Sequence, residues 1–172
     1  MPNHLSVLGI IHTAISILAI FAGIIALIKS GVIEPKSTFG KWYIILTVLT
    51  CVTGFPIMRT GHWGPAHTLT IMVLVLLPLG IYAKSLKVFG KKWQYAQVII
   101  MSATLFLSFV PAVNESFTRL PISHPLAAGP DDPLVKMGLL VIFVLFLAGV
   151  IYQVLVLRAR RKMLANMEPF NS

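Results

Sequence analysis

Five stretches of the chain carry no charged residue, and each of them is mostly apolar. They cover residues 1–28, 42–58, 60–83, 93–114 and 137–157. A helix needs about 20 apolar residues to cross the roughly 30 Å hydrocarbon core of a bilayer. Four stretches reach that length, and the second, with 17 residues, can be extended by its neighbours. The pattern predicts five transmembrane helices in one membrane domain, residues 1–172, with helices near 5–29, 41–60, 66–86, 94–113 and 135–158.

The composition supports this interpretation. Hydrophobic residues make up 57% of the chain and charged residues only 11%, whereas an ordinary soluble domain has about 25% charged residues. The single cysteine, Cys51, excludes a disulfide scaffold. The first stretch lacks the basic start and the cleavage site of a signal peptide, so we expect it to remain as the first helix. The expected fold class is an all-α membrane protein, a bundle of five transmembrane helices.

The basic residues predict the orientation of the bundle. With five crossings, one side of the membrane receives 11 of the 14 lysines and arginines, in the connections 29–41 and 84–92 and in the run 158–162. The other side receives only Arg59, Arg119 and Lys136. Cytoplasmic connections carry an excess of basic residues, so we expect the N-terminus outside and the C-terminus in the cytoplasm. The net charge of +9 then reflects topology and attraction to the lipid bilayer, and no nucleic-acid partner is expected.

The longest predicted connection covers residues 114–134. It holds four prolines and three of the five acidic residues. About 20 residues of non-helical chain in so small a protein are usually functional or mobile. Two interpretations stay open for this extracytoplasmic loop: a lid over the outer helix ends, or a tether that carries the chain between two non-adjacent helix ends.

Two residue patterns concern the helix faces. Ser16, Ala19, Gly23 and Ala26 follow one another in steps of three and four residues, so they share one face of the first helix. Small residues let helix backbones approach closely in lipid, and we expect this face to contact another helix. Tyr43 falls at the predicted inner interface, where aromatic residues form belts.

The histidines are the main candidates for chemistry. All five lie in the outer half or the outer connections of the predicted bundle: His4, His12, His62, His67 and His124. Ionisable residues within a membrane are candidates for a functional site. His12 shares a face with Ser16 and should look into the bundle. His67 follows Pro65, a residue that suits the first turn of a helix.

Imidazole nitrogens bind haem iron, zinc and copper, so two kinds of site are open. One b-type haem would take His12 and His67 as axial ligands, with Arg59 and Arg119 bonded to its propionates. A zinc or copper ion would need three or four ligands, drawn from His12, His62, His67, His124 and Glu115. The third interpretation has no cofactor and treats the histidines as packing residues. No HExxH or CxxCH motif decides among the three.

Residues 12–54 carry a family pattern. His12 precedes Gly23-Ile24-Ile25-Ala26-Leu27, and after a lysine-containing loop Gly40-Lys41-Trp42-Tyr43 opens the second helix. The segment resembles an uncharacterised bacterial family of small membrane proteins with four or five helices. Members often have His-Arg shortly before that glycine, where this chain has Thr38-Phe39. The resemblance implies a bacterial cytoplasmic membrane protein and brings no activity; by analogy, the histidine pattern is also similar to small membrane cytochrome b subunits.

The sequence thus predicts a site that opens to the extracytoplasmic face, between the outer ends of the first three helices and beneath the loop 114–134. The first functional hypothesis is electron transfer through one b-type haem, with a quinol or an outer-face redox protein as the partner. The first alternative is an outer-face metal-binding protein or metal-dependent enzyme. The second is a non-catalytic accessory subunit or a small transporter.

Overall fold

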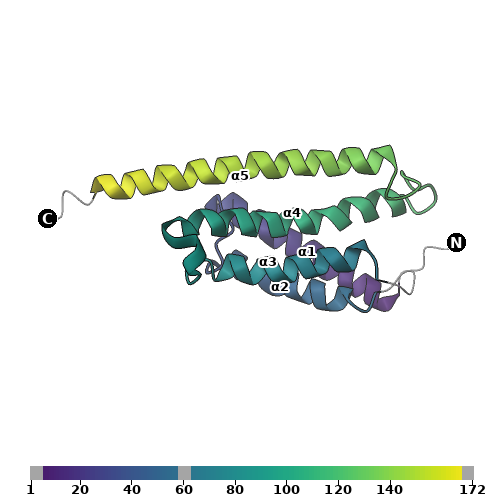
Figure 1. The fold of residues 1–172 in the computed structure, drawn as a ribbon. Coiled ribbons are helices and arrows are strands. Elements are labelled where there is room, and N and C mark those ends of the chain that lie inside the picture. Colours follow the sequence, from purple (N-terminus) through teal and green to yellow (C-terminus); the bar gives the residue numbers. More distant parts are fainter. Residues whose placement is uncertain (1–5, 58–62, 168–172) are drawn as a thin grey trace.

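The computed structural model describes residues 6–57 and 63–167, and all regular structure in these residues is helical (Figure 1). In chain order the elements are α1 (Val7–Ser30), α2 (Thr38–Gly54), α3 (Pro65–Ile81), the short 3₁₀ helix η1 (Lys87–Lys92), α4 (Trp93–Arg119) and α5 (Pro133–Met167). The expected all-helical class is confirmed for the described residues. Three of the described helical segments are long and apolar enough to cross a membrane: α1, the segment 87–119 and α5. The helices α2 and α3 have 17 residues each.

The first two helices begin at the serines that precede them. Ser6 accepts a hydrogen bond from the backbone N–H of Gly9 at 3.1 Å, and Ser37 accepts one from Gly40 at 3.0 Å. These bonds satisfy N–H groups that have no partner inside the helix. The helix α1 ends at Gly31, which has φ 69° and donates its N–H to the carbonyl of Leu27 at 2.8 Å. Glycine adopts this left-handed conformation without steric cost.

The helix α4 is longer than the sequence pattern predicts. It continues six residues beyond 113, so Glu115 and Arg119 lie on a helix rather than in a loop. Their i,i+4 ion pair supports this last part of the helix. The helix ends because Leu120, before Pro121, is extended, as a residue before proline prefers to be. The connection to α5 is therefore residues 120–132.

This shorter connection folds back onto the end of α4. The N–H of Ala127 donates to the carbonyl of Phe117 at 2.9 Å, and the N–H of Leu126 donates to that of Leu120 at 3.1 Å. Asp132 accepts hydrogen bonds from Ala128 and Leu134, the second residue of α5. The loop thus joins two helices that pack on each other, so it is not a tether between non-adjacent helix ends.

The helices pack side by side in an order that brings α4 between α3 and α5 (Figure 1). The helix α1 packs most extensively on α2, through the predicted small-residue face. Ala19, Gly23 and Ala26 of that face are buried, and a Cβ atom added at Gly23 would lie 2.9 Å from Leu105. The contact predicted for this face is confirmed. The helix α5 packs on α4, where Gln153 accepts a hydrogen bond from Ser102 at 3.0 Å.

The position of Tyr43 in the sequence had indicated a residue of the aromatic belt at the membrane interface. The structure instead places its side chain inside the bundle. Its side chain is fully buried, and its hydroxyl donates to Thr104 Oγ1 at 2.8 Å, since Thr104 itself donates to the carbonyl of Met101. The ring belongs to the main hydrophobic cluster of the described residues. The other buried members are Ala22, Ala26, Ile33, Leu77, Met101 and Leu105.

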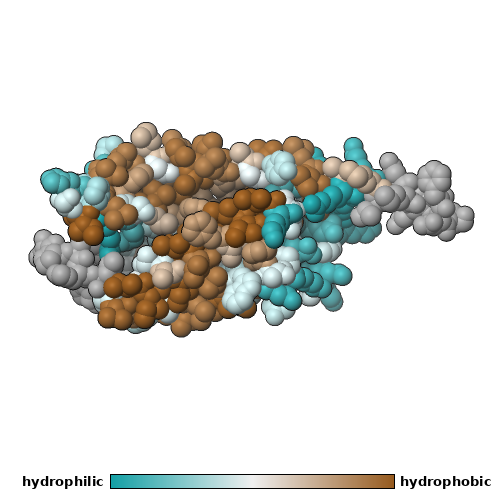
Figure 2. All heavy atoms as spheres, turned by 180° about the vertical axis from the view of Figure 1, so that it is seen from behind, coloured by the Kyte–Doolittle hydropathy of each residue, from teal (hydrophilic) through white to brown (hydrophobic). Residues whose placement is uncertain are grey.

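The two ends of the bundle differ in chemistry. One end, which we call the basic end, is formed by the connection between α1 and α2, by η1 and by the last turns of α5. There Arg160 donates to the carbonyl of Ser30 at 2.8 Å, and the Arg161 guanidinium lies 5.6 Å from the Tyr95 ring. In Figure 2 this hydrophilic end adjoins a broad hydrophobic surface. The opposite end, which we call the histidine end, is formed by the start of α1, the end of α2, the start of α3 and the loop 120–132 (Figure 1).

Candidate functional site

His12 lies about one and a half turns into α1, on the side that packs against the end of α2. Its Nδ1 atom is 3.1 Å from Thr53 Oγ1. The Thr53 hydroxyl donates its own hydrogen to the carbonyl of Leu49 at 2.8 Å, so it can only accept from the ring. Nδ1 of His12 therefore carries the hydrogen, and Nε2 carries the lone pair. An imidazole anchored in this way can accept a proton or bind a metal through Nε2.

Gly54 makes the room that the His12 ring occupies. A Cβ atom built on Gly54 would lie 3.0 Å from Cε1 of the ring. That distance is shorter than ordinary van der Waals contact, so a side chain at residue 54 would displace the imidazole. The backbone of α1 is tied locally as well, because Ser16 donates to the carbonyl of His12 at 2.7 Å. The local sequence of both helices thus fixes the position of His12.

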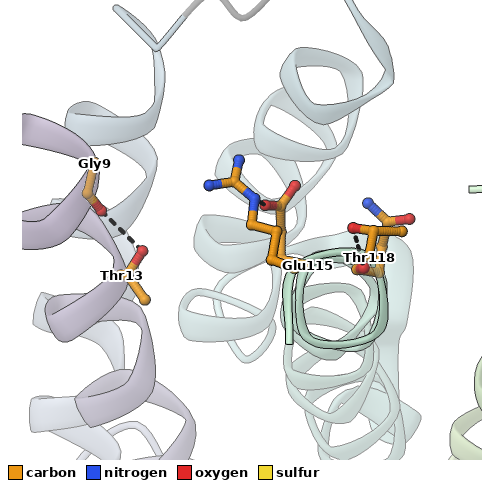
Figure 3. Close-up of polar contacts among 6 residues, drawn as sticks. Gly9, Thr13, Glu115 and Thr118 are labelled. Carbon is orange, nitrogen blue, oxygen red and sulfur yellow. Dashed lines mark hydrogen bonds and ion pairs between the residues drawn. The ribbon is translucent and has the colours of Figure 1, made fainter. Parts of the chain in front are cut away.

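Charged groups reach the same region from α4. Glu115 forms an ion pair with Arg119, one turn later on the helix. Figure 3 shows Glu115 on the side of α4 nearer to α1, where Thr13 donates to the carbonyl of Gly9. Glu115 and Arg119 thus form an ion pair on α4 at the histidine end, and Glu115 lies on the side of α4 that is nearer to α1, the helix that carries His12.

His67 has a different role. Its Nε2 atom is 3.2 Å from the carbonyl oxygen of Phe55, and its Nδ1 atom accepts the backbone N–H of Gly64 at 3.3 Å. Nε2 must therefore donate, and no lone pair is left for a metal. The ring is buried, and its centroid lies 5.0 Å from that of Trp63. His67 fastens the end of α2 to the start of α3.

The two histidines also lie against different sides of the end of α2. His12 meets Thr53 and Gly54 from α1, whereas His67 meets Phe55 from α3. A haem held between them would have to take the Nδ1 lone pair of His67 from the N–H of Gly64, or break the bond from Nε2 to Phe55 and change the tautomer. The described geometry therefore does not fit His12 and His67 as a pair of axial ligands. An open hollow of about 530 Å³ borders the start of α3, but His67 does not line it.

The remaining predicted ligands do not gather around an ion. His124 lies exposed in the loop 120–132, where its N–H donates to the carbonyl of Pro121. Arg59 and His62 fall outside the described residues. Among the residues that the structure describes, no group of three histidine, cysteine, aspartate or glutamate side chains is placed to hold a metal ion. The described geometry thus gives no support to a zinc or copper site.

Hydroxyl groups of α2 and α4 continue the polar region inward from His12. On α2, Thr47 and Thr50 lie between Tyr43 and Thr53, and both have a buried Oγ1 atom with no hydrogen-bond partner among the described residues. On α4, Ser108 and Thr104 lie opposite these threonines, and the hydroxyl of Tyr43 is the last polar group of this region. Toward the basic end the interior becomes apolar. The spacing of these hydroxyl residues in steps of three and four along α2 is a signal in the sequence that could have indicated this polar face.

No family model, no curated protein and no solved structure matches this chain. The resemblance of residues 12–54 to a bacterial membrane family stays a prediction. Any functional conclusion has to come from the residues at the histidine end.

Proposed function

We propose that this chain is an integral membrane protein with five crossings, its N-terminus and histidine end outside and its basic end in the cytoplasm. The excess of lysine and arginine at the basic end supports this orientation. The helices α2 and α3 would each be about 26 Å long, slightly short of the hydrocarbon core. Local thinning of the bilayer and the flanking residues make up such a difference. The proposed location is a bacterial cytoplasmic membrane.

We further propose that the histidine end binds a quinol, and that the chain serves as the quinol-binding subunit of an electron-transfer system. The observation that carries this proposal is the lone pair on His12 Nε2, held in place by the bond from Nδ1 to Thr53. A quinol is soluble in the membrane and has two ring hydroxyls that donate hydrogen bonds. The Nε2 atom is an acceptor for one of them.

Glu115 supports a proton transfer from the bound quinol. When His12 accepts a proton it becomes a cation, and the carboxylate of Glu115 on α4, which also pairs with Arg119, would favour that charge. Oxidation of a quinol releases two protons and two electrons. One proton would pass to His12 and the other to water at the histidine end, while both electrons would pass to a partner redox protein at the outer face.

A second candidate is a single b-type haem held through His12 alone. The same Nε2 lone pair favours it, because a neutral imidazole whose Nδ1–H is hydrogen-bonded is a typical axial ligand. Bound haem would supply one-electron chemistry at the same end of the bundle. Its second ligand would not be His67, for the reasons given above.

Binding of a short-tailed ubiquinol or menaquinol to the purified protein in lipid nanodiscs tests the first proposal. We expect saturable binding to the native chain. His12→Leu should weaken it by about 2- to 13-fold, since a hydrogen bond between neutral groups contributes about 0.5–1.5 kcal/mol. His124→Gln, which changes an exposed loop histidine, is the matched control and should bind as the native chain does.

Absorption spectra of the same samples separate the two candidates. Stoichiometric haem in the native chain, lost in His12→Leu, would favour the haem over the quinol. Absence of saturable quinol binding, or equal binding by the native chain and His12→Leu, would refute the quinol proposal. Thermal unfolding of each variant shows whether a loss of binding reflects a loss of folded protein.

A further inference from the structure

A hollow of about 320 Å³ runs between α1 and α2 on the outside of the bundle. Its walls are large apolar side chains spaced by three and four residues on each helix: Leu18, Phe21 and Ile25 on α1, and Phe39, Trp42 and Leu46 on α2. The floor is Ala22, whose small side chain is buried and lets the two helices approach closely. The hollow is therefore a consequence of the small-residue face of α1.

Phe39 and Leu46 pack partly against the hydrophobic cluster, whereas the other walls face outward to a large extent. Phe21 is 57% exposed and Trp42 is 55% exposed. In a bilayer these side chains would meet lipid. A hollow with apolar walls and an apolar floor has the chemistry to hold a hydrocarbon chain rather than a polar molecule.

The end of the hollow at the basic end carries a positive charge. The ammonium of Lys29 lies 4.5 Å from the centroid of the Phe39 ring, which is one of the walls. Lys36 and Lys41 are exposed on the neighbouring connection and on the first turn of α2. Among the described residues, Glu34 is the acidic side chain of this connection, so the local charge is positive. A ligand that fits must combine a hydrocarbon chain with an anionic group.

We propose that this hollow binds an anionic phospholipid, with one acyl chain between Phe21 and Trp42 and the phosphate-bearing headgroup at Lys29. A bilayer supplies such a molecule in the required orientation, because the apolar walls lie within the hydrophobic surface and Lys29 lies at its edge. Each lysine near a membrane surface adds to the attraction for anionic lipid. This site is independent of the quinol proposal, since it lies at the basic end and shares no residue with the histidine end.

Native mass spectrometry of the full chain tests the proposal, with phosphatidylglycerol and phosphatidylcholine as the competing probes. We expect one phosphatidylglycerol to be retained after detergent removal, in preference to phosphatidylcholine. Lys29→Gln should reduce this preference about five-fold. Lys87→Gln removes the same charge from η1, at the same end but away from the hollow, and should leave the preference unchanged.

A second variant tests the hollow itself. Ala22→Leu fills the floor of the hollow and keeps all the basic residues. It should abolish the retention of both lipids. If the native chain retains the two lipids equally, the lipids only coat its surface and the proposal is wrong. Equal effects of Lys29→Gln and Lys87→Gln would also overturn it, because the attraction would then come from the whole basic end. Retention of a second copy of the chain in place of lipid would assign the hollow to a dimer contact instead.

Discussion

Replacement of His67 by alanine tests the distinction between a structural and a ligand-binding histidine. The change removes two hydrogen bonds, one to the carbonyl of Phe55 and one from the N–H of Gly64. Each such bond contributes about 0.5–1.5 kcal/mol to stability. The ring contact with Trp63, at 5.0 Å between centroids, adds about 0.5–1.5 kcal/mol. We therefore expect His67→Ala to destabilise the junction of α2 and α3 by about 2–4 kcal/mol.

Cys51 reports this destabilisation directly. It is the single cysteine of the chain, it is buried, and its sulfur lies 4.0 Å from the carbonyl of Thr70 on α3. A fluorogenic maleimide can react with it only when α2 and α3 separate. When opening is fast compared with labelling, the labelling rate follows the open population. A loss of 2–4 kcal/mol then raises that rate about 30- to 700-fold.

The control is His124→Ala, which changes an exposed loop residue and should label at the native rate. A labelling rate of His67→Ala within two-fold of the native rate would refute the structural role. Nitrogen chemical shifts of the imidazoles give an independent check. We expect the hydrogen on Nδ1 in His12 and on Nε2 in His67, two opposite tautomers in one protein.

Three further changes have clear expected outcomes. Gly40→Ala places a Cβ atom 1.9 Å from the backbone oxygen of Glu34, so the start of α2 must shift. We expect the free energy of unfolding to fall by about 1–3 kcal/mol, measured by thermal unfolding, because the shift disrupts the serine cap of the helix. Gln153→Leu leaves the Ser102 hydroxyl without its acceptor and should cost about 1 kcal/mol, measured by the same unfolding assay. Backbone N–H bonds from Leu134 and Ala128 lower the pKa of Asp132 below its ordinary value of 3.8, so its stabilising effect is present above that pH and is lost as the pH falls through the lowered pKa. Hydrogen-exchange protection factors at the start of α5, which are corrected for the intrinsic exchange rate, should fall with this loss, and Asp132→Asn should remove that change with pH.

Each of these changes has a matched control or a contradicting result. Gly129→Ala adds a Cβ atom where nothing lies within 4 Å, so it should leave unfolding unchanged, and a Gly40→Ala protein as stable as Gly129→Ala would contradict the predicted overlap. Combining Ser102→Ala with Gln153→Leu should restore most of the stability, since neither polar group is then left unpaired. Protection factors at the start of α5 that do not change with pH in the native chain would show that Asp132 does not cap the helix.

The sequence predicted the five long helices and most of their starts to within a few residues, but the predicted ends at 60, 86, 113 and 158 lie at Gly54, Ile81, Arg119 and Met167. Charge-free apolar stretches mark the helices, serine and proline mark their starts, and the small residues of α1 mark its contact face. The extension of α4 to Arg119 was missed, although Pro121 is a local stop signal, because Glu115 and Arg119 ended the charge-free stretch. Charged residues do not stop a helix when they pair along it.

The site could be predicted only as a set of candidates. The sequence selected His12 and His67 as equal candidates, but their hydrogen bonds give them different roles. The role of an imidazole depends on what each of its two nitrogens meets, and His12 meets Thr53 of α2, 41 residues away in the chain. Tyr43 likewise meets Thr104, 61 residues away.

Apolar length, charge and caps are properties of neighbouring residues, so the sequence by itself determined the helical membrane-protein character and the contrast between the two ends. Tautomers, buried hydroxyl bonds and the hollow between α1 and α2 depend on contacts between helices distant in the chain, so only the tertiary structure decided them.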